Sequence, residues 1–144
     1  MTSDATRTRP AWQNQDVIDR FLDDAEVWAV VGLSGDPDKT AYRIAALLQS
    51  NGKRIVPIHP SAPTVLGQQG YSSLAEVPFH IDVVDVFRRS EAAGQFVDEA
   101  IAIGAGGVWF QLGVVDHDAF ARAQAANLPM VMDTCPAIEW RERG

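Results

Sequence analysis

Cysteine, histidine and basic residues are scarce in this sequence. It contains one cysteine, three histidines, and 12 lysines and arginines against 19 acidic residues. The single cysteine, Cys135, rules out an internal disulfide and fits a reducing compartment. The net charge of −7 argues against a broad nucleic-acid-binding surface, because such surfaces are basic. The histidines share no metal-ligand spacing, so we expect no metal site.

Long apolar runs are missing as well. No stretch approaches the roughly 20 apolar residues that a membrane-spanning helix needs. The first ten residues, MTSDATRTRP, are polar and have no apolar core of the kind that a signal peptide carries. We therefore expect a cytoplasmic protein with no membrane partner.

The composition is that of one globular domain. Of the 144 residues, 47% are hydrophobic and 22% are charged, which is the balance of an ordinary folded domain. This length can bury one sizeable core and is too short for two ordinary domains. We expect residues 1–11 to form a disordered lead-in and residues 12–144 to form the domain.

Apolar strand patterns alternate with helical patterns along the chain. The predicted strands are VWAVVGL, RIVPIHP, DVVDVF, GVWFQLG and PMVMD, at residues 27–33, 54–60, 82–87, 107–113 and 129–133. Before and between them, apolar residues recur with helical spacing. This alternation predicts an α/β fold: a single Rossmann-like, doubly wound, parallel five-stranded sheet with helices on both faces, plus an N-terminal helix at residues 14–23.

Capping residues predict where the helices begin and end. Asp36 stands before Pro37, the pattern of an N-cap followed by proline at the first helical position, and Asn51-Gly52 ends that helix. The other expected features are a capping box from Ser73 to Glu76, an N-cap at Ser90, an inward face formed by Phe96, Val97, Ala100 and Ile101, a helix end at Gly104, and a helix from Asp116 to Asn127.

The first strand ends in a glycine turn, Gly32-Leu33-Ser34-Gly35, and a helix follows it. In a doubly wound sheet, ligands bind beyond the carboxyl ends of the strands, and a helix N-terminus there can bind an anion. The turn does not match the dinucleotide fingerprint. The third glycine would be residue 37, which is proline, and His59-Pro60 follows the second strand where an acidic residue is expected. These differences disfavour NAD.

Two enzyme motifs fail at the same turn. Asp38 stands where the phosphate loop of nucleotide hydrolases needs glycine, and Asp36 stands where a nucleophile elbow around Ser34 needs glycine. A trio of Ser34, His59 and Asp133 carries little weight, because nearly every domain of this size offers one. We therefore assign no catalytic residue.

Charged side chains at the strand ends have two interpretations each. Lys39 opposes the dipole of the helix that follows, so it either meets a bound phosphate or is solvated beside its neighbouring aspartates. In the Arg88-Arg89 pair, one arginine can bind a phosphate or carboxylate bidentately. At least one of the two is expected to form a surface ion pair, with Glu91 or Asp85.

Two further residues at the strand ends leave alternatives open. Phe87 is either a core residue or a platform for an adenine ring. Cys135 is either buried and inert, the usual state of a lone cysteine, or placed beside the reactive end of a ligand. Nothing in the sequence predicts the pKa of this thiol.

Taken together, five segments resemble the small stand-alone CoA-binding domain proteins, whose fold is similar to the N-terminal domain of the succinyl-CoA synthetase alpha subunit. The segments run in order from Val27 to Glu139: VVGLSGDPDKTAYRIAALL, IHPSAPTVLGQQGYSSLAEVP, DVVDVFRRSE, GVWFQLGV and VMDTCPAIE. The resemblance implies that the first glycine turn binds coenzyme A.

The resemblance also implies a set of ligand-binding residues. By position they are Gly32, Ser34, Pro37, Lys39, Tyr42, Pro60, Phe87, Arg88, Gln111, Gly113 and Cys135; their place at the strand ends adds Leu33, Gly35 and His59. This chain departs from the family pattern twice, with His59 in place of an asparagine and Thr134 in place of an arginine.

The expected function is a non-catalytic module that binds or senses CoA or an acyl-CoA. The alternatives are an NAD(P)-binding oxidoreductase or redox sensor, and an accessory subunit of an acyl-CoA ligase. A mixed disulfide between CoA and Cys135 would be a testable consequence. Trp12 and Trp140 either serve a homodimer or fold back on their own domain, and any partner protein is unknown.

Overall fold

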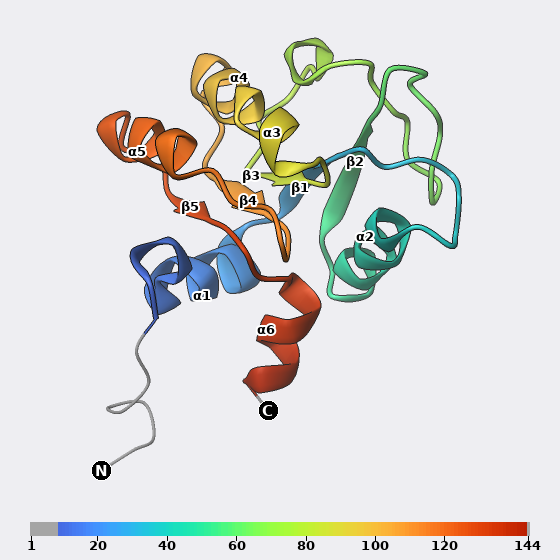
Figure 1. Cartoon of the computed structure of the whole chain (residues 1–144). Coiled ribbons are helices and arrows are strands. Elements are labelled where there is room, and N and C mark those ends of the chain that lie inside the picture. The colour runs from blue at the N-terminus through green and yellow to red at the C-terminus, as the bar shows by residue number, and fades with distance from the viewer. Residues whose placement is uncertain (1–8, 144) are drawn as a thin grey trace.

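The computed structural model describes residues 9–143 and contains one parallel sheet. Its strands lie in the order β2-β1-β3-β4-β5 (Figure 1). They are β1 (Val27–Val31), β2 (Arg54–Ile58), β3 (Val83–Val86), β4 (Val108–Phe110) and β5 (Met130–Val131). The predicted α/β fold is therefore confirmed. The strand order reverses between β1 and β3, which is where such sheets bind ligands.

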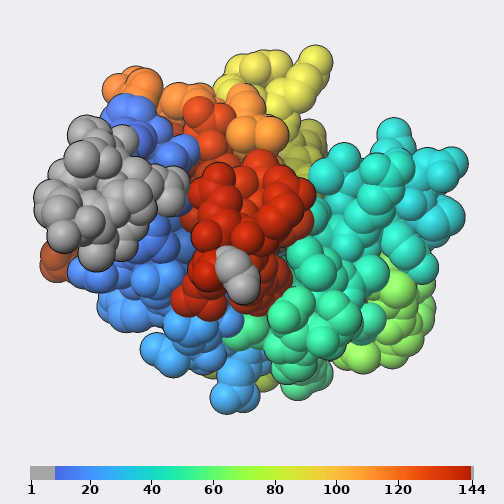
Figure 2. Space-filling model, turned by 90° about the horizontal axis from the view of Figure 1, so that it is seen from below, coloured from blue at the N-terminus to red at the C-terminus, as the bar shows by residue number. Residues whose placement is uncertain are grey.

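Helices cover both faces of the sheet, as Figure 1 shows. One face carries α1 (Gln15–Asp24), α2 (Thr40–Ser50) and α6 (Pro136–Glu142). The other carries the 3-10 helix η3 (Leu74–Glu76) and α3 (Ser90–Ala93), α4 (Gln95–Ile103) and α5 (His117–Ala125). A short 3-10 helix, η2 (Ala11–Gln13), precedes α1. Figure 2 shows α6 lying between α1 and α2.

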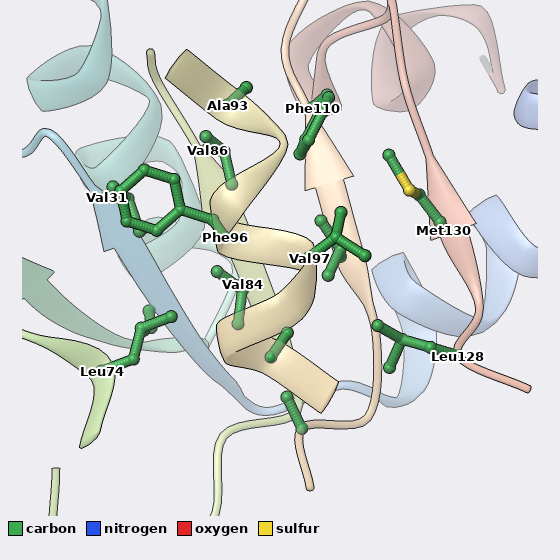
Figure 3. Close-up of a cluster of buried hydrophobic side chains, with 14 of the residues drawn as sticks. Val31, Leu74, Val84, Val86, Ala93, Phe96, Val97, Phe110, Leu128 and Met130 are labelled. Carbon is green, nitrogen blue, oxygen red and sulfur yellow. The ribbon is translucent and has the colours of Figure 1, made fainter. Parts of the chain in front are cut away.

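Alternate residues of each strand face opposite sides of the sheet and build two cores. Val31 of β1 and Val86 of β3 pack under Phe96 and Val97 of α4 (Figure 3). On the other side, Trp28 and Trp109 are completely buried, and they pack in one core with side chains of α1, α2 and α6. Both indole nitrogens donate hydrogen bonds to backbone carbonyls, so neither ring leaves a polar atom unpaired.

The helix after β1 starts later than predicted. It begins at Thr40, and the Asp36 side chain does not cap it. Instead, the Asp36 carboxylate accepts from the backbone nitrogen of Asp38 at 2.9 Å, and its carbonyl accepts from that of Lys39 at 3.1 Å. These bonds close a separate turn in front of the helix, so the prediction of a cap at Asp36 with Pro37 at the first helical position is wrong.

Ser90 is not the predicted N-cap either. It is the first residue of α3, and its hydroxyl accepts from the backbone nitrogen of Val115 at 3.0 Å. This bond ties α3 to the loop after β4. The helical segment is also interrupted, because Gly94 separates α3 from α4. Ile101 is 38% exposed on the outer side of α4, so its predicted inward orientation is wrong.

Other predicted helix ends have mixed outcomes. Asn14 caps α1 through its side chain, and Gly104, as predicted, closes α4 in the left-handed conformation. Asp116 caps α5, which therefore starts where predicted, but α5 ends at Ala125, two residues before the predicted end at Asn127. The short helix after β2 is present, but Ser73 makes no capping bond. The Glu76 carboxylate instead bonds the backbone nitrogen and hydroxyl of Ser72, one residue earlier.

The two ends of the described chain pack onto the domain. Of the predicted lead-in, residues 1–8 lie outside the described residues; Arg9 contacts Glu139 at 3.1 Å, and η2 begins at Ala11. Trp12 lies edge-on to the ring of His117, with centroids 4.7 Å apart. Trp140 packs against the core between α1 and α2. Both tryptophans therefore contact their own domain.

Candidate functional site

Two cavities open at the carboxyl ends of the strands. The larger, of about 720 Å³, lies between the start of α2, the end of β3, α3, the loop after β4 and the start of α6. We call it the α6 cavity. The smaller, of about 520 Å³, lies between the ends of β1 and β2, the loop before η3, and α4, and we call it the β2 cavity. Phe87 and Arg88 line both, so the two spaces share a wall.

The structure brings many of the predicted ligand-binding residues to these cavities. The α6 cavity is lined by Gln111, Gly113 and Cys135, the β2 cavity by Gly32, His59 and Pro60, and both by Phe87 and Arg88. Six others line neither cavity: Leu33, Ser34, Gly35, Pro37, Lys39 and Tyr42. Leu33 is fully buried in the core. Ligand contacts of these residues therefore stay a prediction.

The first glycine turn has one glycine that the fold requires and one that it does not. Gly32 has a φ of +94°, and its nitrogen donates to the Ile58 carbonyl at 2.8 Å. A β-carbon there would lie 2.8 Å from the Phe87 carbonyl oxygen. At Gly35, by contrast, a β-carbon would meet no heavy atom within 4 Å. Gly35 thus offers exposed backbone that a ligand can approach.

The neighbouring arginines have different environments. Arg89 is largely exposed and pairs with Glu91 at 3.3 Å, which confirms the expected surface ion pair. Arg88 lies where the two cavities adjoin. Asp85, the other partner considered, contacts neither arginine, because it is buried within β3 and bonds Gln111.

Asp85 is the functional candidate that sequence reasoning missed. Its side chain is completely buried, and Gln111 Nε2 donates a hydrogen bond to Oδ1. Within residues 9–143, Oδ2 has no hydrogen-bond partner. Burial raises the pKa of this carboxyl to about 8, and the bond from Gln111 opposes the rise. The available signal was an acidic residue inside the apolar strand DVVDVF.

Cys135 lines the α6 cavity and is 9% exposed. Burial raises the pKa of its thiol, while backbone hydrogen bonds from Ala137 and Ile138 at the start of α6 lower it. The negative charge of Asp85 raises it further, so the neutral thiol is favoured. Gln111, which bonds Asp85, and Cys135 thus both line the α6 cavity, together with apolar side chains and the charged residues Arg88, Arg89 and Glu91.

The two departures from the family pattern have local partners. The Thr134 hydroxyl is buried and donates to Glu139 Oε2 at 2.5 Å, so it holds α6 in place. His59 Nδ1 accepts from the backbone nitrogen of Ser61 at 3.2 Å and lies 2.9 Å from its hydroxyl. Thr134 therefore has a packing role, whereas His59 remains on the wall of the β2 cavity.

Residues 9–143 contain no cluster of three or more histidine, cysteine, aspartate or glutamate side chains that could hold a metal ion. In the same part of the chain, no helix is both long and apolar enough to span a membrane.

A parallel sheet with helices on both faces and cavities at its carboxyl edge defines a Rossmann-like ligand-binding domain. Residues 26–141 match the family model described as "CoA binding domain". The chain therefore belongs to the CoA-binding domain family, as the resemblance predicted.

Two similar proteins match most of this chain. The chain is 35% identical over 118 residues to the uncharacterized protein YneT of Bacillus subtilis (strain 168), covering 82% of this chain and 87% of YneT. A solved structure of a hypothetical protein from Pyrococcus horikoshii OT3 superposes with a TM-score of 0.87 at 31% identity, covering 94% of this chain and 96% of that one.

A larger protein shares the fold. The dinucleotide-forming acetyl-coenzyme A synthetase 1 of Ca. Korarchaeum cryptofilum, solved with phosphate and ADP, has a TM-score of 0.68 at 23% identity. The match covers 77% of this chain and 26% of that chain. At this level of identity, the likeness concerns the fold alone.

Proposed function

We propose that this chain is a cytoplasmic, non-catalytic module that binds CoA or an acyl-CoA along the carboxyl edge of its sheet. The supporting observation is that the α6 and β2 cavities adjoin at Phe87 and Arg88. CoA is an elongated molecule with a phosphorylated nucleotide at one end and a thiol at the other. Two adjoining spaces of different character suit such a ligand better than one compact pocket does.

The α6 cavity suits the thiol or acyl end of the ligand. Phe87, Leu112, Val114 and Ile138 give it apolar walls, and Cys135 is its one thiol. Leu112 is 62% exposed, so its side chain is available to pack against the apolar part of a ligand. Burying such a side chain contributes roughly 1.5–3 kcal/mol.

The nucleotide end fits the β2 cavity and the first glycine turn. Arg88 supplies a guanidinium for a phosphate at the junction, and His59 and Ser72 add polar groups to the wall. The carboxylate of Asp36 is bonded to its own turn at Asp38, so it is directed to the backbone. These features support an anionic nucleotide despite the negative net charge of the chain.

The test is thermal denaturation of the apo protein with CoA, dephospho-CoA, NAD and NADP. A ligand at 100 times its Kd adds about 2.7 kcal/mol to the free energy of unfolding. Stabilisation by CoA and not by the dinucleotides supports the proposal, and a weaker effect of dephospho-CoA would show that the 3′-phosphate is recognised. Stabilisation by NAD or NADP alone, or by none of the four, contradicts it. Equal effects of CoA and NADP would support a redox role.

A second measurement examines the thiol end. Incubation with CoA disulfide would let Cys135 attack one sulfur of the disulfide, forming a protein–CoA mixed disulfide and releasing one CoA thiolate. Intact-mass analysis without reductant should then show one CoA-sized adduct. Because Cys135 is the chain's single cysteine, the adduct must disappear in Cys135→Ser. If the wild type forms no adduct, this placement of the thiol end is wrong.

A further inference from the structure

Asp85 occupies a position where the strand pattern calls for an apolar residue. In the sheet register it pairs with Val30 of β1 and Trp109 of β4, in the middle of the buried sheet. Val30 and Trp109 belong to the core that also contains Cys135. Alternation along β3 places Asp85 on the same face as Val83, so its carboxyl projects into that core.

The burial of this carboxyl has no structural explanation within the core. One oxygen bonds Gln111, and the other has no partner within the described chain. An unpaired buried oxygen costs about 1–3 kcal/mol, so a valine here would give a more stable strand. Such orphaned groups in native proteins call for a specific explanation.

Gln111 connects Asp85 with the α6 cavity, because it bonds Asp85 and lines the cavity. Asp85 is completely buried, Gln111 is nearly buried, and Cys135 also lines the cavity. The negative charge of Asp85 raises the pKa of the Cys135 thiol, and the positive charge of Arg141 lowers it. Asp85 belongs to β3 and Arg141 to α6, so the negative charge comes from the sheet and the positive charge from the helix. The charged residues that line the same cavity are Arg88, Arg89 and Glu91.

We propose that Asp85 acts through Cys135: its charge determines the pH range in which the Cys135 thiol becomes a nucleophile toward molecules that enter the α6 cavity. While Asp85 is protonated, loss of the Cys135 proton places one negative charge in the buried region. Once Asp85 is ionised, loss of the thiol proton creates two negative charges in a medium of low dielectric, which is opposed. The two groups therefore share one negative charge, and this behaviour does not depend on whether CoA is the ligand.

The test is the rate at which iodoacetamide alkylates Cys135 in the wild type and in Asp85→Asn. In this reaction the thiolate forms the S–C bond, iodide leaves, and the thiol proton passes to solvent. Labelling reports on Cys135 alone, because the chain has no other cysteine. Asparagine keeps the size of the side chain and can still bond Gln111, and Asp98→Asn on the exposed side of α4 controls for the loss of one charge.

Below pH 7 the two proteins should react at the same rate, because Asp85 is neutral in both. Above pH 8.5 Asp85→Asn should react about three- to ten-fold faster, corresponding to a coupling of about half to one pH unit. A variant that is faster by the same factor at every pH would indicate loosened packing and overturn the proposal. Equal rates throughout would overturn it as well.

A measurement on the wild type keeps the proposal testable if Asp85→Asn does not fold. The carboxyl carbon of Asp85 is followed by ¹³C NMR from pH 5 to 10, alongside the alkylation rate. The proposal expects Asp85 to stay protonated at pH 7 and the rise of the alkylation rate with pH to become shallower as Asp85 ionises. Ionisation complete by pH 6, or a rate that rises without a break, would contradict it.

Discussion

A β-carbon on Gly32 would lie 2.8 Å from the carbonyl oxygen of Phe87, so the end of β1 and the end of β3 touch through backbone atoms. The contact lies at the point where the strand order reverses. Gly32→Ala must therefore separate the two strand ends, and it also places alanine at a φ of +94°. We expect the free energy of unfolding to fall by about 1–3 kcal/mol, measured by urea denaturation. An unchanged value would show that the strand ends can move apart without cost.

Gly35 provides the matched comparison three residues later. A β-carbon there meets nothing within 4 Å, and its φ is not in the left-handed range, so Gly35→Ala should leave the stability of the apo protein unchanged. If CoA approaches this backbone, the methyl group should weaken CoA binding several-fold, measured by titration calorimetry. Equal affinity in the variant would remove Gly35 from the proposed site without affecting the fold argument.

The adjacent arginines offer another internal comparison. Arg88 lines both cavities, whereas Arg89 lines the α6 cavity alone, is largely exposed and is paired with Glu91. Arg88→Ala should weaken CoA binding by about ten-fold or more, since a hydrogen bond to a charged group contributes about 1.5–3 kcal/mol. Arg89→Ala should change affinity by less than about two-fold, because an exposed ion pair contributes little. If the two variants have equal affinity for CoA, Arg88 does not hold a phosphate.

The order of strands and helices could be predicted because each rests on a repeating local pattern. The valine-rich run of β1 and the spacing of Ala41, Ile44 and Leu48 in α2 determine those elements before any tertiary contact forms. The position of the two cavities could be expected from topology alone, since parallel strands present their carboxyl ends at one edge. The strands proved shorter than predicted because their last residues leave the sheet to form that edge.

Other details depend on contacts between distant segments. The Ser90 hydroxyl bonds Val115, 25 residues away, so no local capping rule could reveal its role. The Asp36 carboxylate accepts from the backbone nitrogen of Asp38 in a turn before the helix, and sequence spacing does not distinguish this bond from a helix cap. The environment of Asp85 depends on its two neighbouring strands and on Gln111, so its raised pKa could not be predicted from the sequence.

Burial of Asp85 also makes the stability of the protein depend on pH. The unfolded chain ionises this residue near its ordinary pKa of 3.8, whereas the folded protein keeps the proton until pH about 8. Between these values the folded state binds one more proton than the unfolded state. Through this residue, the free energy of unfolding therefore falls by about 1.4 kcal/mol per pH unit as the pH rises. The contribution is fully present below pH about 4 and is lost as the pH passes the folded-state pKa.

Asp85→Asn isolates this contribution, because all other titrating groups are common to the two proteins. The free energy of unfolding of the variant minus that of the wild type should increase from pH 5 to 8, measured by urea denaturation at each pH. Asp98→Asn removes an exposed carboxylate that pairs with Arg122, so its difference from the wild type should not rise over this range. A flat difference for Asp85→Asn as well would mean that the folded protein ionises Asp85 at an ordinary pKa.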